Sequence, residues 1–130
     1  MADEVRMLGG RPVLLCADEG PRICREADAL DLIGGLWGQE VDWLALPAAR
    51  LGPDFLRLRT GLAGAVIQKF VTYRVRLAIV GDLSAEISKS DALGDVVRES
   101  NAGGHVWFVP DLAALEQRLI EAHAFSSHPR

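Results

Sequence analysis

The apolar run RLAIV at residues 76–80, followed by Gly81-Asp82, restricts the fold of this chain more than any other segment. A strand with one face in solvent alternates polar and apolar residues, whereas this run has no polar residue after Arg76. Continuous apolar strands are typical of parallel sheets that helices cover. The run therefore predicts a buried strand in an α/β domain.

The segments around this strand alternate between extended and helical patterns. Short apolar runs at residues 5–8 and 12–16, separated by Gly9-Gly10, predict a hairpin. The other expected elements are strands over 41–46 and 105–109 and helices over 26–36, 60–73, 91–100 and from 111 onward. The order β-β-α-β-α-β-α-β-α predicts one α/β domain over residues 1–124, with a mostly parallel central sheet flanked by helices, and a flexible tail over 125–130.

The predicted helices have apolar sides, and two of them have a typical residue before the first turn. Ser90 and Asp111 precede the third and last helices, where their side-chain oxygens accept hydrogen bonds from free backbone amides. The residues expected to face the sheet are Ala27, Leu30, Ile33 and Trp37 in the first helix, Leu62, Val66, Phe70 and Tyr73 in the second, and Leu112, Leu115, Leu119 and Ile120 in the last.

The composition is that of an ordinary soluble domain. Of the 130 residues, 49% are hydrophobic and 25% are charged, and the formal net charge is −4. A negative chain has no electrostatic basis for nonspecific binding to nucleic acid, and no apolar segment reaches membrane-spanning length. The acidic start of the sequence, MADE, does not fit a signal peptide. We therefore expect a cytoplasmic protein with no nucleic-acid or membrane partner.

Cys16 and Cys24 are the two cysteines of the chain. Cys16 ends an apolar run and Cys24 lies in a polar turn, and neither has a second cysteine or a histidine at metal-ligand spacing. Because nothing indicates an oxidising compartment, we expect no disulfide between them. No metal and no cofactor is predicted, since no glycine-rich loop matches a phosphate or dinucleotide motif.

In parallel α/β sheets, ligand and switch sites lie at the carboxyl ends of the strands. Here these ends are residues 16–18, 47–60, 81–84 and 110–111. The second segment runs into the predicted helix at residue 60, and helix starts bind anions through free amides. We therefore place the candidate site around residues 54–64.

Thr60 is the only hydroxyl residue in that segment. It is expected to cap the helix, and a phosphate on it would gain from the helix dipole and from Arg57 and Arg59. Gly61 and Gly64 make the start of the helix small. Close packing is the favoured interpretation of these glycines, and a dimer contact is the next. A flat surface or pocket floor, where a partner or ligand approaches the backbone, is the functional alternative.

Two acidic residues are weak candidates for acid/base chemistry. Asp54 follows a proline, as turn residues often do, and Asp82 follows a buried strand, where α/β enzymes keep acidic groups. Ser84 adds a hydroxyl near Asp82, and Gln68 is expected to reach back across its helix to a loop. The spacings show no Ser-His-Asp or Cys-His pairing.

Basic residues surround the middle of the chain. Solvated charges beside acidic neighbours are the favoured interpretation, and a local basic surface is the alternative. These residues are Arg50, Arg57, Arg59, Lys69, Arg74 and Arg76.

The stretches DALDLIG, PDFLRLRTGLAGAVIQKFVTYRVRLAIVGD and RESNAGG resemble a bacterial family known as domain of unknown function 4180. The resemblance extends from Val13 to Leu119, which is nearly the whole chain. The family implies no established activity. It usually has a glutamate directly after the Ala-Gly pair, where this chain has Ala65.

The order of elements is also similar to that of STAS domains of anti-sigma-factor antagonists. In those domains a partner kinase phosphorylates a Ser or Thr at a helix start. A STAS-like family has the motif Asp-Phe followed later by Ser-Phe-Ala-Asp-Glu. Matching the pairs at 54–55 and 62–63 to this motif places the serine at Gly61, one position after Thr60. The resemblance implies a STAS-like fold and a switch near Thr60.

These observations lead to hypotheses of different classes. The first is a regulatory or protein-interaction module that uses residues 54–64, with Asp82 and Ser84 nearby; its partner is another protein or a second copy. The second is a small-molecule-binding domain or enzyme with an acidic pocket. Convergence of Asp54, Asp82 and Gln68 in a pocket would favour the second, and a flat helix start flanked by arginines would favour the first.

Overall fold

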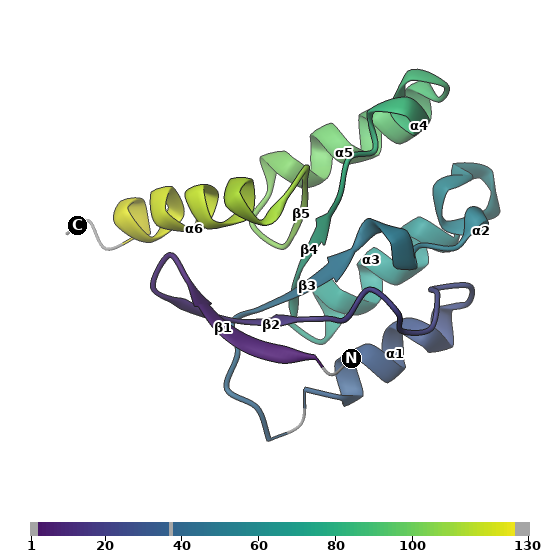
Figure 1. Cartoon of the computed structure of the whole chain (residues 1–130). Coiled ribbons are helices and arrows are strands. Elements are labelled where there is room, and N and C mark those ends of the chain that lie inside the picture. The colour runs from purple at the N-terminus through teal and green to yellow at the C-terminus, as the bar shows by residue number, and fades with distance from the viewer. Residues whose placement is uncertain (1–2, 37, 127–130) are drawn as a thin grey trace.

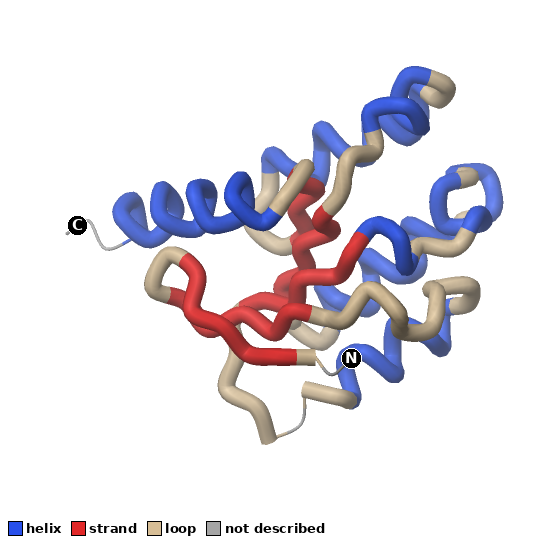
Figure 2. Tube along the Cα trace, viewed as in Figure 1, coloured by secondary structure: helices blue, strands red, loops and turns tan. Residues whose placement is uncertain are grey.

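The computed structural model describes residues 3–36 and 38–126. Its centre is a sheet of five strands whose spatial order follows the sequence (Figure 1, Figure 2). The first pair is antiparallel and the next three pairs are parallel. The chain is therefore an α/β protein with a mixed sheet flanked by helices, as predicted. The strands are β1 (Glu4–Leu8), β2 (Arg11–Leu15), β3 (Trp43–Pro47), β4 (Arg76–Val80) and β5 (Val106–Val109).

The main helices lie where hydrophobic spacing predicts them, and several short ones had no signal in the sequence. Helices of three to five residues are too short to show a period of 3.6 residues. The four predicted helices are α1 (Glu26–Gly34), α3 (Leu62–Thr72), α5 (Asp91–Ala102) and α6 (Leu112–Ser126). The short ones are η1 (Ala48–Arg50), α2 (Pro53–Leu56), η2 (Leu58–Thr60) and α4 (Ser84–Ser88).

The strand order decides which face each helix covers. Parallel strands that follow one another across a sheet, joined by right-handed connections, place every connecting helix on the same side. Accordingly α1, α3, α4 and α5 lie on one side of the sheet, and among the described helices only α6 packs on the other (Figure 1). We call these sides the crossover face and the α6 face.

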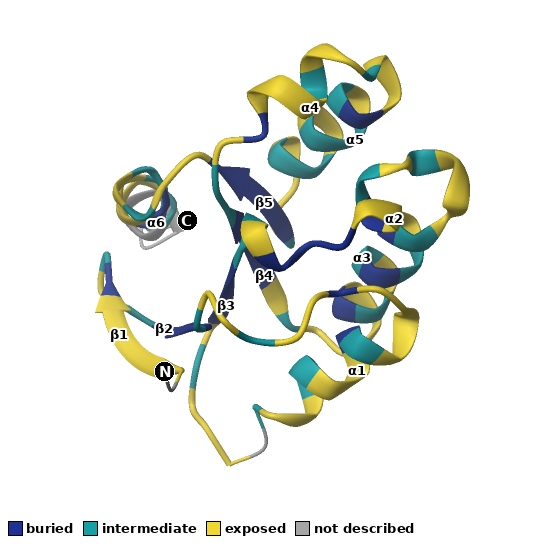
Figure 3. Cartoon of the chain, turned by 45° about the vertical axis from the view of Figure 1, so that its right-hand side comes forward, coloured by how far each residue is buried: buried dark blue, intermediate teal, exposed yellow. Residues whose placement is uncertain are grey.

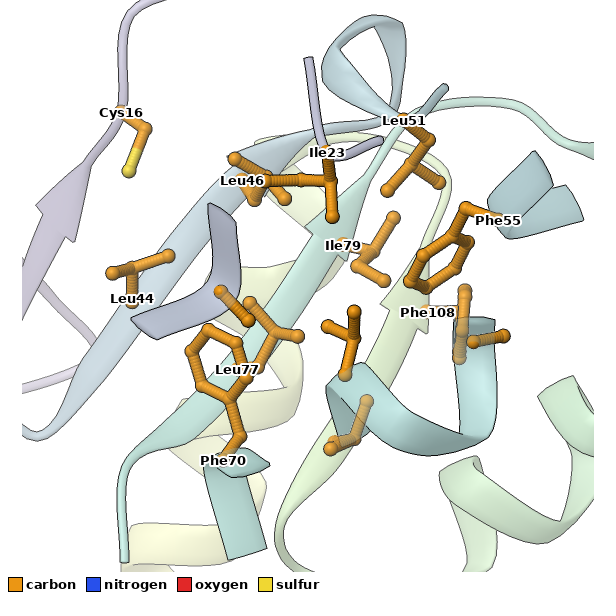
Figure 4. Close-up of a cluster of buried hydrophobic side chains, with 14 of the residues drawn as sticks. Cys16, Ile23, Leu44, Leu46, Leu51, Phe55, Phe70, Leu77, Ile79 and Phe108 are labelled. Carbon is orange, nitrogen blue, oxygen red and sulfur yellow. The ribbon is translucent and has the colours of Figure 1, made fainter. Parts of the chain in front are cut away.

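The crossover face holds the larger of the two apolar clusters. Successive side chains of a strand point to opposite faces, so Leu77 and Ile79 of β4 belong to this cluster and Ala78 to the other. Phe55 from α2 and Phe70 from α3 are 1% and 0% exposed. Figure 4 shows these rings around the side chains of β4.

The α6 face is built around two tryptophans. The ring centroids of Trp43 and Trp107 are 4.3 Å apart, and Leu115 and Leu119 of α6 are buried over this face. The guanidinium of Arg118 lies 4.0 Å from the centre of a Trp107 ring. In Figure 3, β1 is exposed along most of its length.

Several residues expected to face the sheet are exposed instead. In α1 and α6 these residues lie beside the narrow stripe that contacts the sheet, because a helix packed on one side buries about a third of its circumference. Tyr73 follows the last residue of α3 as its C-cap. In α1 and α3 the buried positions are Ala29, Ala63, Val66 and Phe70. The predictions were wrong for Ala27, Leu30 (39% exposed), Tyr73 (56%) and Ile120 (47%), and Trp37 lies outside the described residues.

The predicted turn and caps at three places are confirmed. Gly9 and Gly10 have φ of 57° and 82°, as a two-residue hairpin turn requires. The Ser90 Oγ accepts a hydrogen bond from Leu93 N at 3.1 Å, and an oxygen of Asp111 accepts one from Ala114 N at 2.8 Å. At the C-terminus, α6 includes Phe125 and Ser126, and residues 127–130 of the expected tail lie outside the described residues.

Candidate functional site

The predicted segment forms one side of a hollow of about 430 Å³ at the start of α3, which we call the α3 hollow. Between β3 and α3 the chain makes three short helical turns, so that residues 53–61 form a compact loop before α3 at the carboxyl edge of the sheet (Figure 1). The hollow is lined by Cys24, Glu26, Asp54, Thr60, Gly61, Leu62 and Ala65.

Thr60 holds this loop together and is not the capping residue of α3. The helix begins at Leu62 and its N-cap is Gly61, whose φ of 78° turns the chain in the left-handed region. The Thr60 Oγ lies 2.6 Å from the Asp54 carbonyl oxygen and 2.8 Å from that of Arg57, and its single proton serves one of them at a time. It also accepts a bond from Leu62 N at 3.3 Å. The N-cap of α3 is therefore Gly61, one residue after the predicted Thr60.

The two arginines of the segment, Arg57 and Arg59, are exposed. Neither has an ion pair within the described ranges 3–36 and 38–126. The glycines beside them are open as well, since a Cβ built on Gly61 or Gly64 would meet no atom within 4 Å. The prediction of close packing at these glycines was wrong, because this side of α3 faces away from the sheet. The segment thus presents exposed backbone next to two free positive charges.

The remaining predicted residues do not converge on the α3 hollow. Asp82 and Ser84 line a separate hollow of about 190 Å³ between β4, α4 and β5. An Asp82 oxygen accepts a bond from Ser84 N at 2.9 Å, and the hydrogen bonds from Ser84, its side chain first, lower the pKa of Asp82. Gln68 donates to the Thr72 hydroxyl at 3.3 Å, so it reaches along its own helix and not back to a loop.

Glu26 of α1 and Cys24, in the loop before this helix, complete the other side of the hollow. Lys69 of α3 pairs with Glu26 of α1 at 3.0 Å, and it is half-buried rather than solvated. Asp28 accepts hydrogen bonds from Cys24 N and Arg25 N, at 2.8 and 2.9 Å, and the bond from Cys24 is the main cause of its lowered pKa. These contacts fix the loop that carries the exposed Cys24 thiol.

Arg50 was expected to be solvated and is 5% exposed. It ends η1 and donates to the carbonyl oxygens of Pro21 and Ala17, at 3.0 and 3.2 Å. The guanidinium occupies the space that a side chain at position 20 would need, and Gly20 leaves it free. No local pattern could have shown this, because the loop that accepts its hydrogen bonds lies about 30 residues earlier in the chain.

Cys16 is buried near this arginine and has no disulfide. Burial raises the pKa of its thiol to about 11, with a further rise from Asp3 and an opposing effect of Arg50. It lines a hollow of about 140 Å³ at the carboxyl edge on the α6 side, with Leu15, Asp18, Ala45, Pro47, Val80 and Leu112. A thiol held in its neutral form is a poor nucleophile, so this hollow is not arranged for cysteine chemistry.

Two further absences hold within the part of the chain that the structure describes. No group of three or more histidine, cysteine, aspartate or glutamate side chains is placed to hold a metal ion. None of the described helices is both long and apolar enough to cross a membrane.

Comparison with known proteins identifies the family of this chain. The model of the family described as Domain of unknown function (DUF4180) matches residues 8–119. No curated protein and no solved structure gives a significant match. Since the family match covers most of the 130 residues, the chain belongs to this family.

Proposed function

We propose that this member of the DUF4180 family is a STAS-like regulatory domain that acts by binding another protein. The contact surface is the loop and helix start at residues 54–64. The observation on which the proposal rests is the pair of exposed arginines without ion pairs, Arg57 and Arg59, beside the open backbone of Gly61 and Gly64.

The hydrogen bonds of Thr60 make this surface suitable for recognition. They tie its side chain to the carbonyl oxygens of Asp54 and Arg57. A loop that is already ordered loses less conformational entropy when a partner binds, so more of the contact energy appears as affinity. Exposed arginines favour a partner with carboxylate or phosphate groups, because guanidinium groups form paired hydrogen bonds with both.

Phosphorylation of Thr60 is the mode of regulation that fits this geometry. The modification would remove the proton that Thr60 donates to the loop and add a charge of about −2 next to Arg57 and Arg59. The hydrogen bonds from Thr60 to the loop carbonyl oxygens would be lost, and the two arginines would pair with the phosphate. A partner that binds these arginines in the unmodified protein would therefore be released.

The α3 hollow supports a second candidate, a small-molecule site. Its volume of about 430 Å³ lies within the usual range for ligand pockets, roughly 300–1,000 Å³. Glu26 and Asp54 would give it acidic walls. Catalysis receives less support, because Asp54 and Asp82 line different hollows and Gln68 reaches neither.

The test is affinity purification from the native cells with charge-reversed variants. Arg57→Glu combined with Arg59→Glu should abolish co-purification of a partner that the wild-type chain retains. The control is Lys89→Glu with Arg98→Glu, which makes the same charge change at the end of α4 and in α5, where Arg98 is paired with Asp95. Equal retention by both double variants, or equal loss, would refute this surface.

A second arm tests Thr60. Thr60→Asp should weaken binding of the same partner, whereas Thr60→Ser keeps the hydroxyl and should bind as the wild type does. If no partner is retained by any form, and a metabolite bound to the protein changes with Asp54→Asn, the small-molecule candidate replaces the proposal.

A further inference from the structure

The amino-terminal edge of the parallel strands brings together charged residues that are far apart in the sequence. Arg11 and Arg76 are the first residues of β2 and β4. Asp42 and His105 directly precede β3 and β5. Arg74 lies in the turn between α3 and β4. This edge is opposite to the carboxyl edge, where the sequence places the candidate site.

A hollow of about 420 Å³ lies at this edge, and we call it the amino-edge hollow. Its one carboxylate, Asp42, is already paired with Arg11 at 3.1 Å. Arg74 and Arg76 have no ion pair with any residue that the structure describes. The hollow therefore has an excess of positive charge although the whole chain is negative. Its walls are Val41, Asp42, Val71, Arg74, Arg76 and His105.

Arg74 occupies a backbone position that favours glycine. Its φ is 58°, and it is the only non-glycine residue with positive φ among those described. Arg74 N donates to the Val71 carbonyl at 3.1 Å and Val75 N to that of Phe70 at 2.9 Å. This is the bonding pattern of a Schellman helix end, whose left-handed residue is usually glycine. A strained residue of this kind points to a use for its side chain.

His105 supplies a second, independent observation. Its Nε2 is buried and has no hydrogen-bond partner within the described part of the chain. Buried polar atoms in native proteins are nearly always paired, because an unpaired one loses its hydration without compensation. His105 lines the amino-edge hollow. A rotation of its ring would let the unpaired nitrogen form a hydrogen bond with a ligand oxygen in that hollow.

We propose that the amino-edge hollow binds the phosphate group of a small organic phosphomonoester. Arg74 and Arg76 pair with the phosphate oxygens, as guanidinium groups do in phosphate sites. The imidazole of His105 donates a further hydrogen bond. Val41 and Val71 contact the organic part, for which a hollow of about 420 Å³ leaves room beyond the phosphate itself.

The test is a titration of the full chain, followed by amide NMR, with phenyl phosphate, inorganic phosphate and phenol as probes. Phenyl phosphate should shift the amides of Arg74, Arg76 and His105 in a saturable way and bind more tightly than inorganic phosphate, and phenol should not bind. Equal affinities for phenyl phosphate and inorganic phosphate would overturn the assignment of an organic ester. Absence of saturation at millimolar concentration would overturn the site.

Arg74→Gly separates binding from folding. Glycine suits the left-handed backbone at this position, so the variant should unfold at the same or a higher temperature than the wild type. Its dissociation constant for phenyl phosphate should rise about tenfold or more, since a charge-assisted contact is lost. Arg76→Gln should weaken binding similarly, and the control Arg98→Ala, which removes an exposed arginine paired with Asp95, should not. Unchanged binding by Arg74→Gly would refute the proposal.

The result is distinguishable from that of the proposed protein contact. The amino-edge hollow and the α3 hollow lie at opposite ends of α3, which is about 16 Å long. Shifts confined to Gly61 and Leu62 on titration would place the anion at the helix start and overturn the present assignment. Such shifts would not decide the role of Arg57 and Arg59 in protein binding, which the affinity purification tests separately.

Discussion

The crossover face and the α6 face of the sheet are covered unequally. Helices α1, α3, α4 and α5 lie on the first, together with the loop of α2, whereas α6 is the described helix on the second. The difference follows from a strand order without reversal, since all right-handed connections then fall on one side. A segment after the last strand is free of this constraint and can cover the other side, as α6 does.

The two faces are also held by different kinds of contact. Every helix of the crossover face lies within a connection between two strands, so the chain holds it from both ends. The α6 helix is attached to the sheet through its first end, its buried leucines and the contacts of Arg118 with Trp107 and Asn101. We therefore expect α6 to open locally at a lower free energy than α3 does.

The largest expected effect is on the crossover face. Phe70→Ala removes a ring that is 0% exposed and packed between α3 and the sheet, and it should lower the free energy of unfolding by about 3–5 kcal/mol. Urea unfolding followed by circular dichroism measures it. The control Val71→Ala, at a site 38% exposed, should change stability by less than about 1 kcal/mol. Similar losses for both variants would show that the crossover face is not the main core.

On the α6 face, Leu119→Ala should cost about 2–4 kcal/mol and act locally. Leu119 is 1% exposed and Ile120 is 47% exposed, so Ile120→Ala is the matched control. Hydrogen exchange should show faster exchange of the α6 amides with little change in α3. Equal acceleration in both helices would mean that the two faces open together, and the comparison would fail.

The next effect is a pH dependence at the carboxyl edge. The pKa of Cys16 is raised from 9.0 to about 11, so the folded state keeps a proton that the unfolded state releases. The stability that this proton contributes is fully present below pH 9 and declines as the pH rises towards 11. Near pH 10 the free energy of unfolding should have fallen by about 1 kcal/mol. Comparison of the wild type with Cys16→Ala across this range isolates the thiol. Parallel stability curves would contradict the burial of Cys16.

The smallest effect concerns the attachment of α6. Arg118 lies over Trp107 and donates to the Asn101 side-chain and carbonyl oxygens. Arg118→Met keeps much of the side-chain length and should cost about 1 kcal/mol, from the lost cation–π contact and hydrogen bonds. Arg98→Ala, which breaks an exposed pair with Asp95, should cost less than about 0.5 kcal/mol. A loss no larger than that of Arg98→Ala would show that the leucines alone hold α6.

Only part of the geometry around residues 54–64 could be predicted from the sequence. The exposed Arg57 and Arg59 next to a helix start could be located, because a loop that enters an amphipathic helix has a local pattern. The pairing of this segment with Glu26 and Cys24 of the α1 region could not, since it depends on how α1 and α3 pack together. The separation of Asp54 from Asp82 could not be predicted either, because it depends on how the segments after β3 and β4 fold relative to each other.

The sequence by itself determined where the long elements lie. Apolar runs, the 3.6-residue period and short-range signals such as Gly9-Gly10 and Ser90 act between near neighbours, so each can be identified locally. Only the tertiary structure decided which side each helix covers, that Arg50 is buried beneath a distant loop, and that Arg74, Arg76 and His105 share one edge. These outcomes depend on contacts between residues far apart in the chain, which no local window contains.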